Sequence, residues 1–168
     1  MLLDTVKTYY SQDNIIVREA TLTDVDTLKM TMKQADIDEI KASHGHTPEQ
    51  ALLLSLKEST IALTVEFEGE CVAIFGVCSE GSLVTDQGVI WLLSSEKLFT
   101  HALRFVRHSR EFVDLMLTYN SFLYNFIDSR NAKSIAWLKW LGATFYEAEP
   151  YGIDQLPFHL FYFKRGQL

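Results

Sequence analysis

Cysteine, glycine and proline are scarce in this chain of 168 residues, which contains two, eight and three of them. Cys71 and Cys78 are too few for a disulfide framework or a zinc ribbon, and both lie in an apolar run that predicts buried free thiols. Net positive charge is also lacking, because the formal charge is −7. We therefore expect no general binding of the nucleic-acid backbone, although a negative net charge is compatible with a local basic patch.

Long apolar runs are absent as well, since none approaches the roughly 20 residues of a membrane-spanning helix. The opening stretch MLLDTVKTYY has neither the basic start nor the apolar core of a signal peptide. Hydrophobic residues, in contrast, make up 48% of the chain and aromatic residues 12%, as in a folded protein. The chain shows no repeat or linker, so we expect a single domain over residues 1–168. We expect this domain to be soluble and either intracellular or carried in a larger particle.

Hydrophobic periodicity predicts alternating strands and helices. A helical period covers residues 23–45, 47–60, 95–117 and 131–142, with Thr23 and Thr47 as the expected N-caps of the first two helices. Strand-like runs cover residues 14–21, 61–67, 71–78, 88–93, 121–128, 143–148 and 157–165, and Gly69 suits the turn between the second and third. The order β-α-α-β-β-β-α-β-α-β-β predicts an α/β fold with a mixed sheet of the α+β kind.

The stretch Asn131–Ala148, NAKSIAWLKWLGATFYEA, joins a short helix to a strand through Gly142. This closing helix, the element order and the stretch IIVREATLTDVDTL at residues 15–28 resemble the GNAT acyltransferase family. The matching helix positions are Asn131, Ser134, Ile135, Ala136, Leu141 and Gly142. The resemblance spans nearly the whole chain in element order. It implies a single GNAT-like domain in which acetyl-CoA enters a V-shaped opening between the strands at 88–93 and 121–128.

A narrower resemblance rests on VTDQGVIWLLS at residues 84–94, ADIDEIKASHG at residues 35–45, and the closing helix. Together they resemble the GNAT-like internal virion proteins of short-tailed bacteriophages, which also place Asp-Gln before a strand that contains Trp. This resemblance implies a protein in the host cytoplasm and the virion. It implies a protein partner, either a virion component or a host protein. The net charge and the lack of long apolar runs predict neither a nucleic-acid partner nor a membrane span.

The GNAT resemblance also implies a glycine-rich loop after the fourth strand, where backbone N–H groups and a helix N-terminus hold the pyrophosphate. The corresponding stretch, LLSSEKLFTHAL at residues 92–103, has no glycine and carries Glu96 where phosphate would arrive. Ser94, Ser95 and Glu96 are instead expected to cap the helix without a ligand. Where acetyl-CoA binding is retained, the expected cofactor contacts are Trp91, Leu92, Leu93, Ser94, Ser95, Lys97 and Asn131.

The catalytic groups that the same resemblance implies have no clear counterparts in this sequence. The family's usual general acid, a Tyr seven residues after the helix-opening Asn, falls on Leu138, which has no proton to give. Tyr124 and Tyr146 could substitute, although aromatic residues in strands are more often part of the core. Asp128 is a candidate base near a strand end, and its commoner alternative role is to form the turn before the closing helix.

Three other groups of residues have plain structural alternatives. His44 and His46 lack companions at metal-ligand spacing, so a solvated loop is expected there and no metal site. Trp137 and Trp140 stand three apart, so one is expected to face a groove or a partner. A basic cluster consists of Arg104, Arg107, His108 and Arg110. It could bind a CoA phosphate or an acidic partner, or it could form a solvated face in which Arg107 pairs with Glu111.

Two functions therefore remain open. In the first, a phage-type GNAT-like protein with a degenerate acetyl-CoA loop and no usual general acid serves in binding, assembly or infection. In the second, an active acetyl-CoA-dependent N-acyltransferase uses a non-standard loop and acid on a small-molecule or protein amine. The sequence leaves the acceptor, the partner and the oligomeric state undetermined.

Overall fold

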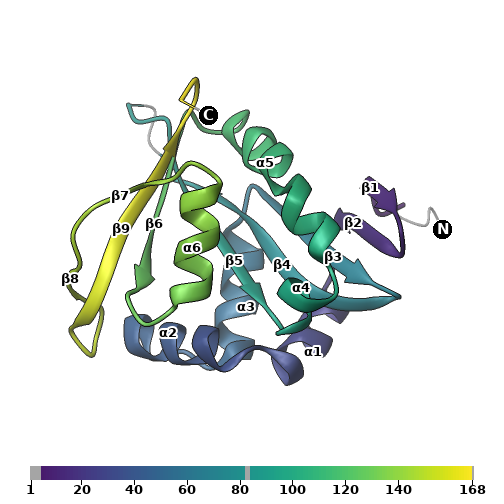
Figure 1. Cartoon of the computed structure of the whole chain (residues 1–168), viewed down its shortest axis with the longest axis horizontal. Helices are drawn as coiled ribbons and strands as arrows, with labels where there is room; N and C mark the ends of the chain where they lie inside the picture. The colour runs from purple at the N-terminus through teal and green to yellow at the C-terminus, as the bar shows by residue number, and fades with distance from the viewer. Residues whose placement is uncertain (1–4, 82–83, 168) are drawn as a thin grey trace.

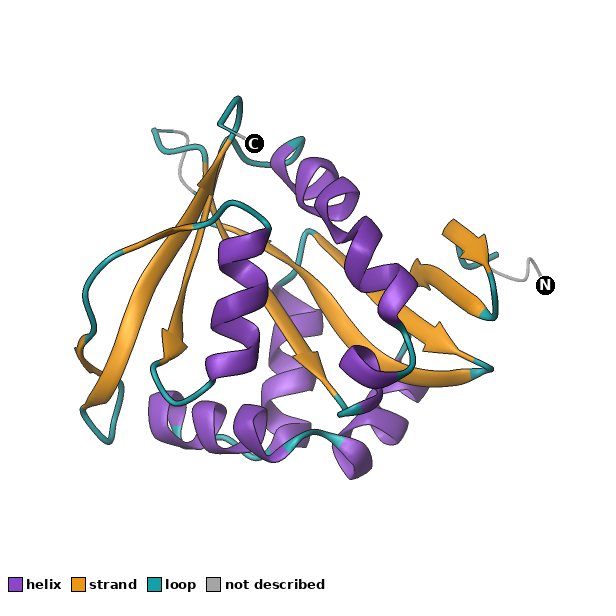
Figure 2. Cartoon of the chain, viewed as in Figure 1, coloured by secondary structure: helices purple, strands orange, loops and turns teal. Residues whose placement is uncertain are grey.

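The computed structural model describes residues 5–81 and 84–167. Residues 1–4, part of the stretch that predicts no signal peptide, lie outside the described residues. Within the described ranges no helix is long and apolar enough to cross a membrane. Figures 1 and 2 show one layered domain with helices on both faces of a twisted sheet.

The helices and strands of the described residues have the following bounds. The helices are α1 (Leu22–Thr31), α2 (Gln34–His44), α3 (Pro48–Glu58), α4 (Lys97–Thr100), α5 (Leu103–Leu117) and α6 (Ala132–Trp140). The strands are β1 (Thr8–Gln12), β2 (Ile15–Glu19), β3 (Ile61–Phe67), β4 (Glu70–Ser79), β5 (Gln87–Ser94), β6 (Phe122–Asp128), β7 (Thr144–Phe145), β8 (Glu149–Tyr151) and β9 (Leu156–Lys164).

The described strands form one nine-stranded sheet in the order β1-β2-β3-β4-β5-β6-β9-β7, with β8 also paired to β9. Neighbours are antiparallel except β5 and β6, which run parallel because α4 and α5 connect them on one face. The middle of the sheet therefore contains a parallel pair of strands, as the strand–helix–strand order predicts. Strand β1 at the edge is an addition that the sequence pattern did not indicate.

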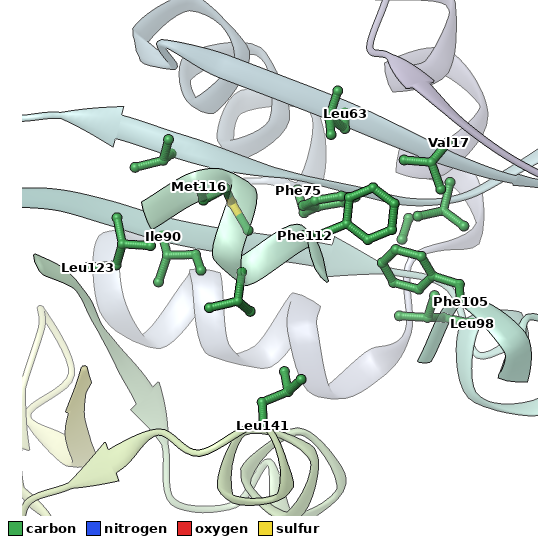
Figure 3. Packing of buried hydrophobic residues seen from close by; sticks show 14 of the residues in the cluster. Val17, Leu63, Phe75, Ile90, Leu98, Phe105, Phe112, Met116, Leu123 and Leu141 are labelled. Atoms are coloured by element: carbon green, nitrogen blue, oxygen red, sulfur yellow. The ribbon is translucent and has the colours of Figure 1, made fainter. Parts of the chain in front are cut away.

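Each face of the sheet carries its own apolar core. On the face of α5 and α6 the core includes Phe75, Phe105, Phe112 and Leu141. Figure 3 shows the three phenylalanine rings close together, with Leu141 apart from them beside α6. On the other face a smaller core joins α1 and α3 to β4, centred on Ile74. Both cysteines are free; Cys71 is buried and Cys78 is half-buried, which agrees with the expected thiols.

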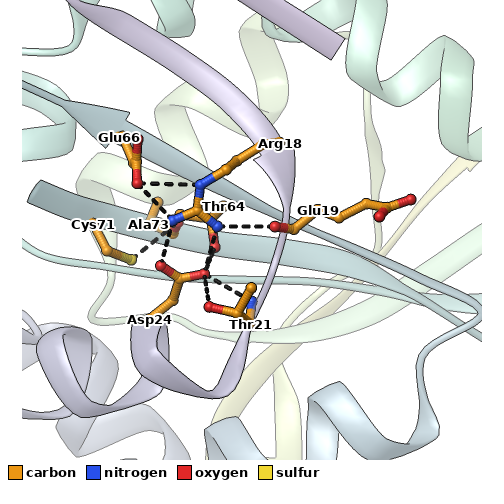
Figure 4. A network of polar contacts seen from close by, with 8 residues as sticks. All are labelled: Arg18, Glu19, Thr21, Asp24, Thr64, Glu66, Cys71 and Ala73. Atoms are coloured by element: carbon orange, nitrogen blue, oxygen red, sulfur yellow. Dashed lines mark hydrogen bonds and ion pairs between the residues drawn. The ribbon is translucent and has the colours of Figure 1, made fainter. Parts of the chain in front are cut away.

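A polar network fixes the first helix to the sheet (Figure 4). The Arg18 guanidinium on β2 donates to Asp24 of α1 at 2.7 and 2.9 Å and to Glu66 of β3 at 2.5 Å. Asp24 also accepts from the Thr21 N–H and the Thr64 hydroxyl, each at 2.8 Å. Burial alone would raise the pKa of Asp24, but these hydrogen bonds outweigh burial and hold it below its usual value.

The predicted first helix is two helices, and its cap was misplaced. Thr21 caps α1 in a capping box with Asp24, so Thr23 is not the N-cap. The chain leaves the helix after Thr31 because the Lys33 N–H donates to the Ser94 carbonyl at 2.9 Å and Met32 bridges to Ser95. A hydrogen bond to a distant strand thus replaces the intrahelical one.

The helix predicted at residues 95–117 is also interrupted, between α4 and α5 at Ala102. Ser94 and Ser95 do not cap it, because their hydroxyls are buried without a hydrogen-bond partner among the described residues. Glu96 holds the cap position but makes no side-chain capping bond. The predicted cap at Thr47 is confirmed, because its side chain accepts from the Gln50 N–H at 3.2 Å.

Candidate functional site

Strands β5 and β6 separate partway along their length. They pair only at Gln87 with Phe122, Gly88 with Leu123, and Val89 with Tyr124. Beyond Val89 the two strands diverge, so the rest of β5 has no strand partner on that side (Figure 1). The V-shaped opening that the resemblance implies between these two strands is therefore present.

Side chains take up part of the free edge of β5. Asn125 donates its Nδ2 to the Ile90 carbonyl at 2.7 Å, and the Ser94 N–H donates to Asp36 Oδ2 at 2.9 Å. The Ser94 carbonyl accepts from the Lys33 N–H at 2.9 Å. Because alternate residues of a strand direct their backbone groups to the same edge, Leu92 also faces the opening. Hydrogen bonds from other residues of the chain therefore already use backbone groups at both ends of the free edge, at Ile90 and at Ser94.

The deep end of the opening holds a buried polar cluster from three elements. The Lys33 ammonium donates to the Ser134 hydroxyl at 2.9 Å and lies 3.4 Å from Asp36 Oδ1. The amide of Asn131, at the start of α6, donates to the same Asp36 oxygen at 3.3 Å. Burial raises the pKa of Asp36, and the nearby Lys33 and the hydrogen bonds only partly offset this. The cluster ties the start of α2, the end of β5 and the start of α6 together.

Glu39, one turn along α2, extends this cluster. It accepts from the Asp128 N–H at 2.8 Å. Its pKa is raised to about 8 by burial first and by the negative charge of Asp36 second. Its side chain keeps some accessible surface because it lines two cavities, one on each face of the sheet. A carboxyl group that titrates near neutral pH at the meeting point of two cavities is equipped for ligand binding or proton transfer.

The cavity on the face of α5 and α6 is small. Its volume is about 100 Å³, and Phe105, Trp137 and Leu138 are among the residues that line it. Trp137 also packs against Phe99 of α4, and the two rings meet edge to face at 5.4 Å. The Lys33 ammonium lies 5.0 Å from the centre of the Phe99 ring. Aromatic and cationic side chains therefore fill the space between α4 and α6.

The expected cofactor contacts fall into three groups. Trp91, Leu92 and Leu93 line the cavities at the opening, and Trp91 also donates its Nε1 to Ser59 at 2.8 Å. Asn131 belongs to the polar cluster, while Lys97 is engaged in an ion pair with Glu70 at 2.5 Å. The structure thus gathers Trp91, Leu92, Leu93, Ser94 and Asn131 around one opening, and directs Lys97 and the Ser95 side chain elsewhere.

The candidate catalytic residues are not assembled together. Tyr124 donates its hydroxyl to Glu80, which raises its pKa to about 12. Tyr146 is 55% exposed and lines neither cavity at the opening. Asp128 accepts from the Arg130 N–H at 2.9 Å and pairs with its guanidinium at 2.7 Å, as the turn-forming alternative predicts.

The sequence reasoning missed Asp36 and Glu39. Their spacing of three puts them on one side of α2, together with Ile40 and Ser43, which line the second cavity. Acidic residues on the sheet-facing side of a helix were the available signal, because such positions are usually apolar. Their role depends on Ser94 and Asn131, which are distant in sequence, and no local pattern reveals those contacts.

The remaining groups of residues match their plain alternatives only in part. His44 is the last residue of α2 and not part of a loop, and its ring stacks on that of His46 at 5.6 Å. No group of three or more potential metal ligands occurs within residues 5–81 and 84–167. Glu111 pairs with His108 at 3.2 Å, and not with Arg107. Trp137 packs against the core while Trp140 is 54% exposed, so the two Trp side chains do face differently.

The raised pKa of Glu39 predicts a pH-dependent stability. In the unfolded chain this group titrates near 4.5 and in the fold near 8, so between these values only the folded state keeps the proton. Raising the pH from about 5 to about 9 therefore costs stability through this group. A Glu39→Gln variant has no such proton to lose, so its unfolding free energy relative to wild type should rise by roughly 4 kcal/mol over this range, about 1.4 kcal/mol for each pH unit between about 5 and 8.

Urea denaturation at several pH values measures this difference. Asp114→Asn is the control, because this exposed carboxylate of α5 makes no ion pair with any described residue, and it should track the wild type throughout. A Glu39→Gln curve that runs parallel to the wild type at every pH would show that Glu39 titrates normally.

Comparison with solved structures identifies the fold. The chain superposes on the ribosomal-protein-S5-alanine acetyltransferase from Vibrio fischeri with a TM-score of 0.68 and 15% identity, over 95% of this chain and 97% of that one. It matches the spermidine N-acetyltransferase from Vibrio cholerae, solved with CoA and spermine, with a TM-score of 0.68 and 9% identity, over 93% and 98%. At such low identity these likenesses establish the fold alone. The chain has the GNAT fold, as its closing helix and element order predict.

Sequence comparison adds the family. No curated protein sequence gives a significant match. The model of one protein family matches residues 61–149, more than half of the chain, from the hairpin strand β3 to β8. This chain therefore belongs to the phage family described as "Bacteriophage T7, probable scaffold protein Gp13".

Proposed function

We propose that this chain is a phage assembly or virion protein built on a GNAT fold whose acetyl-CoA opening is occupied by its own side chains. The observation that carries the proposal is the pairing of Ser94. Its N–H is bonded to Asp36 and its carbonyl to the Lys33 N–H, both at 2.9 Å. A pantetheine arm would need backbone groups at this edge, and these two are already satisfied.

The place for a pyrophosphate offers further support. The Ser95 N–H donates to the Val72 carbonyl at 2.9 Å, and Glu96 adds a negative charge beside it. The helix that follows, α4, has only four residues and therefore little dipole to hold an anion. Lys97, the nearest cation along the chain, is paired with Glu70. The cavity on the face of α5 and α6, at about 100 Å³, is by itself smaller than the 300 Å³ or more that is usual for a small-molecule pocket.

The missing acid supports the same proposal. Leu138, the position at which the family resemblance implies a proton donor, lines the cavity on the α6 side and has no proton to give. Tyr124 and Tyr146, the possible substitutes, line neither cavity at the opening. A protein with neither a free cofactor edge nor a positioned acid is better suited to binding than to acetyl transfer.

A partner surface is available on α5 and α6. The exposed Trp140 side chain lies beside Arg110, which donates to the Trp140 carbonyl at 3.1 Å, with its guanidinium 6.0 Å from the ring. Arg107 is exposed on the same helix and makes no ion pair with any described residue. Trp and Arg are the residues that most often anchor protein contacts. The family description as a scaffold protein supports a role in particle assembly.

An active N-acyltransferase is the second candidate, and two observations favour it. The strands do separate, and Leu92 still directs its backbone groups into the opening. Glu39 titrates near neutral pH where the two cavities meet, as a general base would. The Vibrio cholerae neighbour was solved with CoA, and in this second candidate the same opening would take acetyl-CoA.

Thermal unfolding in the presence of acetyl-CoA separates the two candidates. Ligand at about a hundred times its dissociation constant would stabilise the fold by about 2.7 kcal/mol, so we expect no change in melting temperature up to about millimolar acetyl-CoA. An active spermidine N-acetyltransferase serves as the positive control. A saturable rise would overturn the internally occupied opening. Lys97→Ala and Asn131→Ala should then reduce the rise, whereas Lys139→Ala, an exposed lysine on α6, should not.

Mass spectrometry of phage particles and assembly intermediates tests the assembly role. We expect the chain in one or both, and Trp140→Ala should reduce its incorporation without unfolding it, because that side chain is 54% exposed. Tyr146→Ala removes an equally exposed aromatic side chain elsewhere and should have no effect. Absence of the chain from particles and intermediates alike would contradict an assembly role. Normal incorporation of Trp140→Ala would exclude α6 as the contact.

A further inference from the structure

The charge of this chain is distributed unevenly. Residues 95–142, which include α4, α5, β6 and α6, contain seven of the fifteen lysines and arginines and four of the twenty-two acidic residues, a formal charge of +3. The rest of the chain carries the balance of −10. Figure 1 shows α4, α5 and α6 together on one face of the sheet. The exposed side chains of α5 and α6, the α5–α6 surface, therefore form a positive region on a negative protein.

Three cations of the α5–α6 surface have no carboxylate partner. Arg107, Arg110 and Lys139 are exposed and make no ion pair with any described residue. Arg110 instead donates to the Trp140 carbonyl at 3.1 Å, and the Lys139 ammonium lies 5.5 Å from the centre of the Phe145 ring. Because these contacts leave the positive charges uncompensated, carboxylates of another molecule can pair with them without displacing an internal partner.

Neighbouring cations on the same face differ, because each has an internal carboxylate. The Arg104 guanidinium at the start of α5 lies 2.6 Å from Asp13, and the Lys133 ammonium at the start of α6 lies 3.8 Å from Glu96. The uncompensated charge is therefore confined to the three side chains named above, beyond the first turn of each helix.

The α5–α6 surface also offers apolar contact area. Trp140 is 54% exposed at the end of α6. Ala136 lies three residues before Lys139 on the same side of α6 and is exposed too, so an approaching main chain meets a small side chain there. The hydrogen bond from Arg110 to the Trp140 carbonyl already holds the guanidinium in place, which reduces the entropy lost on binding. Trp and Arg held in this way are the usual anchors of a protein contact.

The extent of the positive region favours a short acidic segment over a nucleic acid or a second copy. Duplex DNA carries one charge for about every 1.7 Å of its length and continues beyond three cations. Glu111 and Asp114 are exposed on α5 beside those cations, so an extended polyanion meets repulsion from them and from the rest of the chain. Two copies of a chain with a formal charge of −7 also repel each other. A short segment places its few carboxylates on the cations alone.

We propose that the α5–α6 surface binds a short acidic segment of another protein, with its carboxylates on Arg107, Arg110 and Lys139 and an apolar side chain on Trp140. This inference rests on the proposed assembly role and names the chemistry of the partner. The charges steer the segment and fix its orientation, and the Trp140 ring supplies the apolar contact that holds the complex together.

Isothermal titration with synthetic peptides tests the chemistry of the partner. The probe is a capped peptide with glutamates on both sides of a leucine, and the control peptide has glutamine in place of each glutamate. In about 20 mM salt we expect a dissociation constant below about 1 mM for the glutamate peptide and at least about tenfold weaker binding of the control. Salt at about 500 mM should weaken the glutamate peptide by about tenfold, because it screens the attraction. No saturation at about 5 mM, or equal binding of both peptides, would overturn the proposal.

Substitutions locate the binding. Arg107→Gln combined with Arg110→Gln should weaken the glutamate peptide by about fivefold or more, because two of the three charges are removed. Trp140→Ala should weaken it by about threefold or more and checks the apolar contact independently. Lys41→Gln removes an exposed lysine of α2, on the other face of the sheet, and should bind like wild type. Unchanged binding by the double arginine variant and by Trp140→Ala would count against the proposed surface.

Further measurements distinguish the other occupants. Tighter binding of an oligothymidylate of matched charge than of the glutamate peptide would assign a nucleic acid and overturn the proposal. Self-association in sedimentation that the double arginine variant loses would assign a second copy and overturn it as well. A chain found in phage particles that has no affinity for the glutamate peptide would keep the assembly role and remove only the acidic partner. Peptide binding by a chain absent from particles and intermediates would contradict the assembly role and keep the acidic site.

Discussion

The buried carboxylate of Asp36 is the group on which the rest of this site depends. It receives hydrogen bonds from Ser94 and Asn131 and lies 3.4 Å from the Lys33 ammonium, so one side chain joins a helix start, a strand end and a second helix start. Burying such charges costs several kcal/mol, and good partners on every side are needed to offset that cost. The cluster therefore holds the opening in one arrangement and uses the strand edge that a cofactor would need.

The sequence predicts those parts of the fold that adjacent residues determine. Thr47 followed by Pro48 and Gln50 caps a helix within three positions, and Gly45 ends a helix with a φ of 72°. Such local signals predict the order of helices and strands. This order and the sequence of the closing helix together predict the GNAT fold. The break at Lys33 has no such local signal, because it arises from a hydrogen bond to the carbonyl of Ser94 in a distant strand.

The candidate site is predicted less well for the same physical reason. Leu138 and the glycine-free loop direct attention to the opening, because the absence of an expected group can be recognised from spacing alone. Asp36 and Glu39 are missed, because a carboxylate on a helix face is ordinarily solvated and only the packing of α2 against β5 and α6 buries it. The GNAT fold by itself does not decide the function, so the proposed binding role rests on the side chains at the opening.

The central claim is that the chain's own side chains satisfy the edge of β5 where acetyl-CoA would pair. The most direct measurement is the amide spectrum of ¹⁵N-labelled protein with and without about millimolar acetyl-CoA. The account predicts that the amide resonances of Leu92 and Ser94 keep their positions and that the Ser94 amide, bonded to Asp36, exchanges slowly with solvent. A saturable shift of these two resonances on adding acetyl-CoA would contradict it.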